Sequence, residues 1–403
     1  MRFTRRALCL AGASALATPA FAAEPSHDVT ADQDFDELWE TLRDRYCYFA
    51  EKRTDWARVR RMYRPLAIAA ETMDDYTEIV RQVLNELYDA HTHLADPPDG
   101  APRWPLFDLY AERHEGAVRI VAVQDESAAA DAGLKSGETI LNIDNADIEA
   151  AIAARMPRCL TRPDPVADAY AINCAIAGHR GQARDIVVRS ADGATRSVHL
   201  PLKQSPERPN LDSRAIDAFG YIRIRSFADN AVAAGFDAAL ANFRDTRGLI
   251  IDVRDNGGGD TAVARPIMGR FITERRAYAR MRRREGAGLS APWTEYVDPQ
   301  GPFTYDKPVV VLTTRWSASM AEGFPMGMSD IGRARIVGTP MMGLGAAVYH
   351  INLDRTGIQA QYSGEPVYDT KDAPRSSVRP DVETAPDADI LAAGIAELRR
   401  LTA

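Results

Sequence analysis

Pro308-Val-Val-Val-Leu-Thr-Thr-Arg-Trp-Ser-Ala-Ser-Met-Ala-Glu-Gly323 changes from a strand pattern to a helix pattern across one short polar turn. Ser319 stands where the predicted strand has ended and the predicted helix begins. The first N–H groups of a helix have no helical partner, and the positive end of the helix dipole stabilises developing negative charge. Both properties suit the nucleophile of an acyl transfer. The alternative is structural, because Ser319 and Glu322 also fit a capping box.

A second stretch of this kind carries three glycines. Residues 248–253 predict a buried strand, and Gly257-Gly258-Gly259 follow it before another helix pattern. Without side chains, backbone N–H groups can approach an anion closely. A nucleotide-phosphate loop is disfavoured, because neither the Gly-Lys-Ser/Thr ending nor the G-x-G-x-x-G pattern is present. We interpret the stretch as an oxyanion-binding loop beside Ser319, with a structural turn as the alternative.

His91 is the candidate general base. A base for a serine hydroxyl needs a pKa near neutral and must reach the hydroxyl. His91 follows the helix pattern at 72–88, which suits a side chain aimed into a cleft. The alternative is a polar residue that only ends a helix.

The first residues predict a signal peptide. Three arginines precede an apolar stretch at 7–17, and Ala20-Phe21-Ala22 forms a small-residue cleavage pattern. Segment 1–23 therefore predicts export to the periplasm or the medium, by the twin-arginine or the Sec route. Its removal takes the formal charge from −8 to −11, which disfavours nucleic-acid binding. The mature chain has no apolar run of about 20 residues that could span a membrane.

The pattern of the mature chain divides into three parts. Residues 24–100 predict helices, including one at 56–63 that ends before Pro65, and residues 105–205 predict β-strands. Residues 212–403 alternate strands with helices, which predicts βαβ units on a largely parallel sheet. The fold class expected is therefore α/β. Cys159 and Cys174 are either a disulfide or buried thiols, and no cysteine spacing indicates zinc.

Several motifs together resemble a known family. They are Ile251-Asp-Val-Arg-Asp-Asn-Gly-Gly-Gly259, Ser317-Ala-Ser-Met-Ala-Glu322, Asp89-Ala-His-Thr92 and Val378-Arg-Pro-Asp-Val382. With them, the chain resembles the C-terminal-processing (tail-specific) serine peptidases, the tricorn protease core and the interphotoreceptor retinoid-binding protein modules. The resemblance implies a ClpP/crotonase-like core, an N-terminal helical region and a PDZ-like β domain. Such a domain captures peptide C-termini by strand addition, but residues 104–112 lack the usual glycine-containing carboxylate loop.

The resemblance also implies site residues. Ser319 matches the nucleophile, and the N–H of Met320 with that of Gly257 or Gly258 matches the oxyanion hole. The lysine base of the tail-specific branch is replaced by Leu344, so the resemblance points to the tricorn-like branch, in which His91 matches the base. The orienting acid is assigned to Asp372, with Asp89 and Glu365 left open. No metal or cofactor is implied.

We therefore expect an exported serine endopeptidase that acts on peptides or unfolded proteins. With an imidazole base, activity should fall as pH drops through about 6–7. The alternative is a non-catalytic protein that binds peptides or apolar ligands on the same fold. The sequence leaves the oligomeric state and the cleavage specificity open.

Overall fold

The computed structural model describes residues 27–204 and 207–403. The predicted signal peptide, residues 1–23, lies outside this part of the chain. Within the described residues, no helix is long and apolar enough to cross a membrane. Cys47, Cys159 and Cys174 are buried thiols, which decides the alternative left open for Cys159 and Cys174.

The N-terminal region is helical, as predicted. Its helices are α1 (His27–Arg45), α2 (Trp56–Ile68) and α3 (Met73–Asn85), with the short turn η1 (Phe49–Glu51). Asp55 and Thr72 cap the starts of α2 and α3 with their side chains. The prediction that α2 ends before Pro65 was wrong, since the helix continues to Ile68. Apolar positions on both sides of Pro65, including Tyr63 and Ala67, are buried, and this packing outweighs the local cost of proline.

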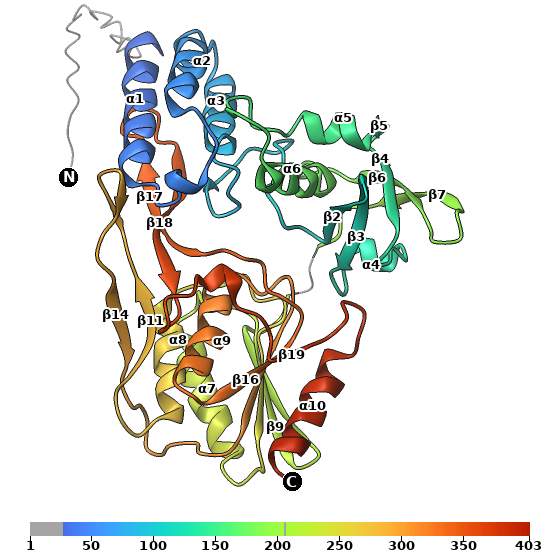
Figure 1. Cartoon of the computed structure of the whole chain (residues 1–403), viewed down its shortest axis with the longest axis vertical. Coiled ribbons are helices and arrows are strands. Elements are labelled where there is room, and N and C mark those ends of the chain that lie inside the picture. The colour runs from blue at the N-terminus through green and yellow to red at the C-terminus, as the bar shows by residue number, and fades with distance from the viewer. Residues whose placement is uncertain (1–26, 205–206) are drawn as a thin grey trace, which may run out of the picture.

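These helices share their hydrophobic core with a hairpin from the far end of the chain. The hairpin consists of β17 (Ala346–Asn352) and β18 (Gln359–Tyr368), and β1 (His93–Leu94) pairs with β18. Ile351, Leu353 and Tyr362 are buried against the apolar faces of the N-terminal helices. The N-terminal region is therefore joined to the last third of the chain by packing (Figure 1).

The middle domain, as we call residues 105–200, is built on one antiparallel sheet with strand order β2-β3-β4-β6-β7. Its strands are β2 (Leu109–His114), β3 (Ala117–Val123), β4 (Thr139–Ile143), β5 (Ala146–Asp147), β6 (Arg184–Arg189) and β7 (Thr195–Leu200). Its helices are α4 (Ala128–Asp131), α5 (Ile148–Ala153) and α6 (Pro165–Ala177). The sequence analysis did not predict α6, whose residues are apolar almost all round and are largely buried.

The core, as we call residues 211–403, contains a six-stranded sheet with order β19-β16-β15-β10-β9-β8. Its strands are β8 (Leu211–Ile216), β9 (Phe219–Ile224), β10 (Leu249–Asp252), β15 (Val309–Thr313), β16 (Ala334–Gly338) and β19 (Val382–Glu383). All neighbours are parallel except β8 and β9. The predicted α/β class is confirmed.

Helices cover both faces of the core sheet (Figure 1). α10 (Ile390–Leu401) packs on one face; α7 (Ala231–Asn242), α8 (Thr261–Met268) and α9 (Met320–Asp330) pack on the other. A long antiparallel arm of β11 (Arg276–Met281) and β14 (Trp293–Val297) runs beside α9 and pairs with β18, and its tip carries β12 (Arg284–Glu285) and β13 (Gly288–Leu289). The remaining short turns are η2 (Gly269–Phe271) and η3 (Arg375–Ser377).

The sheet explains why two distant motifs meet. β10 and β15 are parallel neighbours, so their carboxyl ends lie at the same edge of the sheet. The glycine loop follows β10 and the Ser319 turn follows β15, so the two motifs meet at that edge.

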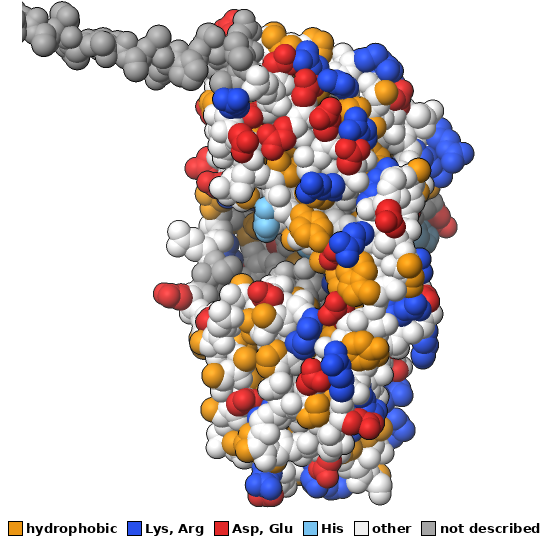
Figure 2. Space-filling model, turned by 90° about the vertical axis from the view of Figure 1, so that its left-hand side faces the viewer, with side chains coloured by type: hydrophobic (Ala, Val, Ile, Leu, Met, Phe, Trp, Pro, Cys, Tyr) orange, Lys and Arg blue, Asp and Glu red, His pale blue; other side chains and the backbone are white. Residues whose placement is uncertain are grey.

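Over the face of the molecule shown in Figure 2, acidic and basic side chains are interspersed.

Candidate functional site

Ser319 occupies a strained turn. It is the N-cap of α9, with φ 54° and ψ −115°, a left-handed conformation that costs a non-glycine residue about 1–3 kcal/mol. Neighbouring bonds hold the turn in place. The Ser317 hydroxyl donates to the Val253 carbonyl at 2.8 Å, and the Ala318 N–H donates to the Asn256 carbonyl at 2.9 Å. The turn is thus fixed to the end of β10 and its glycine loop.

Glu322 connects this turn to a second one. Its buried carboxylate accepts the N–H of Ser319 at 3.0 Å, of Gly343 at 2.9 Å and of Leu344 at 2.8 Å. Burial raises the pKa of Glu322 to about 7, although the nearby Arg375 guanidinium lowers it. Glu322 therefore contributes to capping, as the structural alternative held, and also ties the Gly343-Leu344-Gly345 turn to the start of α9.

The glycine loop lies against Ser319. A Cβ on Gly258, whose φ is 106°, would stand 2.8 Å from the Ser319 Cβ and from the Ala318 carbonyl oxygen. Only glycine therefore fits at this position. The Gly258 N–H donates to the Asn256 side chain at 2.8 Å, so this donor is already used. Of the two glycines considered for the oxyanion hole, Gly257 is the one whose N–H remains open.

Met320 supplies the other open donor. As the first residue of α9, it has no acceptor within the helix for its N–H. Across residues 27–204 and 207–403, the structure records no acceptor for the N–H of Met320 or of Gly257. Met320 directly follows Ser319, and Gly257 directly precedes Gly258, the glycine that lies against Ser319. The two open donors therefore belong to the turn and the loop that meet at Ser319.

His91 lies in a turn that Asp89 organises. The Asp89 carboxylate accepts the His91 N–H at 3.0 Å and the hydroxyls of Thr92 at 2.9 Å and Ser363 at 2.7 Å. The His91 side chain is only 7% exposed, and its Nδ1 is buried without a hydrogen-bond partner among the described residues. The backbone of Ala346 lies close enough to the ring to raise its pKa.

The surroundings of His91 differ from those expected of a neutral-pH base. Burial lowers the pKa of His91 to about 4; the Asp89 carboxylate opposes this shift, and the Arg375 guanidinium adds to it. In this environment the pKa of His91 lies below the range of pH 6–7 in which activity was expected to fall. Within the described chain, no hydrogen bond joins His91 to Ser319 in this structure.

Asp372 does not lie beside His91. Its side chain, 42% exposed, pairs with Arg280 on β11 and lies 3.9 Å from Arg282, just after that strand. The structure records no contact between Asp372 and His91, so the geometry does not support Asp372 as the orienting acid. The carboxylate next to His91 is that of Asp89, one of the residues left open. Glu365, the other, accepts the Tyr349 hydroxyl at 2.6 Å.

A chain of contacts nevertheless connects the two candidate residues. Glu322 holds Ser319 and Leu344 together by their N–H groups. The buried Arg375 donates to the carbonyl of Leu344 and, at 2.9 Å, to that of Ala346. Ala346 in turn contacts the His91 ring. The sequence analysis gave no role to Arg375, which lies three residues after Asp372.

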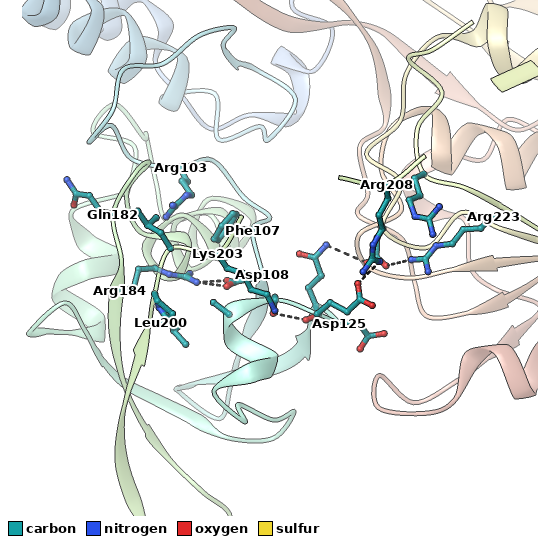
Figure 3. A pocket seen from close by; sticks show the side chains of 18 residues that line it. Arg103, Phe107, Asp108, Asp125, Gln182, Arg184, Leu200, Lys203, Arg208 and Arg223 are labelled. Atoms are coloured by element: carbon teal, nitrogen blue, oxygen red, sulfur yellow. Dashed lines mark hydrogen bonds and ion pairs between the residues drawn. The ribbon is translucent and has the colours of Figure 1, made fainter. Parts of the chain in front are cut away.

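Two cavities adjoin this region. One, of about 350 Å³, is lined by the Gly343-Leu344-Gly345 turn, by Tyr48 and by Lys52. The other, of about 370 Å³, lies between the middle domain and the core (Figure 3). At its edge Asp255, which precedes the glycine loop, accepts Gln124 at 3.5 Å and Arg223 at 3.1 Å.

The middle domain also contacts the Ser319 turn directly. The Trp316 indole N–H donates to the Phe107 carbonyl at 2.6 Å. The Arg315 guanidinium lies 4.3 Å from the centre of the Tyr110 ring on β2. One end of β2 is thus attached to the turn that presents Ser319.

Comparisons with known proteins find related domains, sequences and folds. Peptidase family S41 matches residues 218–384, and the tricorn protease C1 domain matches residues 29–93. Tricorn protease homolog 1 of Streptomyces coelicolor is 26% identical over 59% of this chain, which spans only 23% of that protein's length. The chloroplastic C-terminal processing peptidase of Tetradesmus obliquus is 22% identical over 91% of this chain and 80% of its own. The crystal structure of mature CPAF superposes with a TM-score of 0.62 at 16% identity, covering 93% of this chain and 97% of its own.

Proposed function

We propose that this chain, a serine-type peptidase with a peptidase family S41 domain at residues 218–384, cleaves peptide bonds through an acyl-enzyme on Ser319. The observation that carries the proposal is the position of Ser319, in a strained turn that is followed by the open N–H of Met320 and packed against the loop that carries the open N–H of Gly257. A nucleophile needs such a place, since charge develops on the substrate oxygen as the hydroxyl attacks.

The two open donors would stabilise the oxyanion. Loss of one donor from such a site typically costs roughly 3–4 kcal/mol of transition-state stabilisation. Gly258 contributes in another way, because its missing side chain lets the loop approach Ser319. Its own N–H serves to hold Asn256.

His91 is the base in this proposal. Its unpartnered Nδ1 can accept a proton, and the contacts through Arg375 and Leu344 lead from its ring to the Ser319 turn. Since no bond joins the two side chains in this structure, His91 and Ser319 must approach each other when substrate binds. Asp89 takes the place of the orienting acid, because it fixes the backbone of His91 and opposes the loss of basicity.

The substrates we propose are peptides or unfolded proteins, and the site of action is outside the cytoplasm. The first part rests on the peptidase domain and on relatives that are named as processing peptidases. The second rests on the signal-peptide pattern in residues 1–23. No metal or cofactor has a role in the proposed reaction.

A fluorophosphonate probe tests the nucleophile. The mature protein should be labelled, and Ser319→Ala should abolish both the label and casein hydrolysis. Ser317→Ala is a poor control because that hydroxyl supports the turn; Ser290→Ala, on the distant arm, is a matched one. Equal labelling of wild type and Ser319→Ala would refute Ser319 as the nucleophile.

Three observations favour the alternative, a non-catalytic binding protein on the same fold. His91 has a depressed pKa and no bond to Ser319, and Leu344 replaces the lysine base. A folded wild-type sample that neither takes the label nor hydrolyses casein or chromogenic esters would support the binding protein.

A further inference from the structure

Strand β2 lies at the edge of the middle-domain sheet, and helix α6 packs along it. A PDZ-like domain, which the sequence predicts here, takes an extended peptide as an additional strand between such an edge and such a helix. For this, the edge strand must offer unpaired N–H and C=O groups. The state of these groups on β2 therefore decides whether the groove can receive a peptide.

The side chain of Asn173 on α6 already bonds to the outward-facing N–H and C=O groups of Ala111 on β2. Its side-chain Oδ1 accepts the Ala111 N–H at 3.0 Å, and its Nδ2 donates to the Ala111 carbonyl at 3.0 Å. This is the pair of bonds that a residue of an added antiparallel strand would exchange with Ala111. A third bond, from Nδ2 to the Ala169 carbonyl at 2.9 Å, fixes the amide to its own helix. Asn173 is 4% exposed, so water does not compete for these bonds.

A second contact closes the same groove farther along β2. The Arg113 guanidinium bonds to Asp168 on α6 at 2.9 and 3.0 Å and to Glu149 on α5 at 2.7 Å. The strand is thus joined to its helix at two positions on the path of an added strand. Toward its start, β2 meets the nucleophile turn through Tyr110 and Arg315.

We propose that the Asn173 amide is a built-in substitute for a bound peptide, so that the middle domain does not capture substrate tails by strand addition. The domain instead forms a fixed wall beside the Ser319 turn. Substrates then reach the site without recognition of a free C-terminal carboxylate. This last consequence rests on the proposed peptidase function, whereas the occupied groove does not.

Peptide binding tests the groove without any need for activity. The probe is a fluorescein-labelled decapeptide that ends in Leu-Ala-Ala with a free carboxylate, and its C-terminal amide is the comparison. In the full mature chain carrying Ser319→Ala, fluorescence anisotropy should show no saturable binding up to about 1 mM, a limit that corresponds to about −4 kcal/mol. A Kd below about 100 μM for the free acid, weakened at least tenfold in the amide, would overturn the proposal.

Asn173→Ala, made in the same background, should open the edge of β2. We expect hydrogen exchange at the Ala111 amide to rise at least tenfold, and the decapeptide to bind at least tenfold more tightly than to the parent. Asn242→Ala, at an exposed asparagine of α7, is the matched control and should change neither quantity. Faster exchange at Ala111 without any gain in peptide affinity would show that Asn173 is not what excludes the peptide.

Should Asn173→Ala fail to fold, the parent measurement still decides the question. A second arm uses the active enzyme: kcat/KM for a peptide substrate and for its C-terminal amide should agree within about twofold, since a factor of two is only about 0.4 kcal/mol. A preference of tenfold or more for the free acid would contradict the inference. Absence of any hydrolysis would refute the proposed function and leave the binding result intact.

Discussion

Glu322 shows how much one buried side chain can organise at this site. Three backbone N–H groups from two turns converge on its carboxylate. These bonds are strongest when the carboxylate is charged. Because burial raises the pKa of Glu322 to about 7, the charged form is complete only above neutral pH.

Replacing Glu322 by glutamine should lower kcat up to about 100-fold, because the Ser319 turn would lose its exact alignment. In the wild type, kcat/KM should fall as pH drops through about 7. In Glu322→Gln, this decrease near pH 7 should be absent. The pH dependence of kcat/KM for both proteins checks this. Glu274→Gln, an exposed residue paired with Arg276, is the control and should keep the wild-type profile.

The same pKa shift has an effect on stability. The folded chain holds the Glu322 proton more tightly than the unfolded chain, whose carboxyl titrates near 4.5. The contribution of Glu322 to stability is therefore present below that pH and decreases as pH rises through about 7. The free energy of unfolding, measured with urea between pH 5 and 8, should therefore decrease less with rising pH in Glu322→Gln than in the wild type.

The pKa of His91 is shifted in the opposite direction, below its value in the unfolded chain. Its folded pKa is about 4, below the unfolded value of 6.5, so the unfolded chain takes up the proton first. Stability should therefore decrease as pH falls from 6.5 toward 4, and less so in His91→Gln. Histidine NMR signals should show one ring that stays neutral at pH 5. A His91 signal that titrates near 6.5 would contradict the buried position.

At the scale of elements, the strand ends and the loops that follow them create the site. β10 and β15 are parallel neighbours, so the glycine loop and the Ser319 turn leave the sheet at one edge. The loop can approach the turn only because Gly258 has no side chain. An experiment can separate two reasons for a glycine here: its positive φ and the lack of room for a Cβ.

Gly258→Ala and Gly357→Ala form a matched pair. Both glycines have a positive φ, 106° and 72°, but only Gly258 lacks room for a Cβ. Gly357→Ala should cost about 1 kcal/mol of stability and leave activity intact. Gly258→Ala should reduce fluorophosphonate labelling by about 100-fold or more, because the added methyl group displaces Ser319. Equal labelling rates in the two variants would contradict the close approach.

At the scale of the whole molecule, a segment near the C-terminal end of the chain packs against its N-terminal helices. The β17–β18 hairpin leaves the core and completes the hydrophobic core of the N-terminal helices. It also brings Ala346 and Ser363 to the His91 turn. His91 and Ser319 are therefore held in relation to one another by packing between the first and last quarters of the chain.

Ile351→Ala should destabilise both parts together. The side chain is 4% exposed within the shared core, and truncation of such a residue costs about 2–5 kcal/mol. Hydrogen exchange should increase in α1–α3 and in β17–β18 alike. Protection lost only in the hairpin would show that the helices form an independent unit. Ile395→Ala, on α10 at the opposite face of the core sheet, is the control.

The sequence by itself determined the local units. Alternating strand and helix patterns predicted the α/β core, and the motifs around Ser319 and Gly257 identified turns that the structure places at one edge of the sheet. Hydrophobic period and glycine content are local properties, so a single sequence shows them. The helix through Pro65 and the missed α6 are cases in which burial outweighed the local pattern.

Only the tertiary structure decided which side chains and donors meet. In the folded chain the N–H of Gly258 is bonded and that of Gly257 is open, Asp372 pairs with Arg280 of the arm, and Asp89 lies beside His91. The tertiary structure also put Arg375 between the two turns. The bond of Gly258 and that between Asp89 and His91 are local, but the contacts of Asp372 and Arg375 join residues far apart in the chain, and burial depends on the whole fold; no local pattern encodes these.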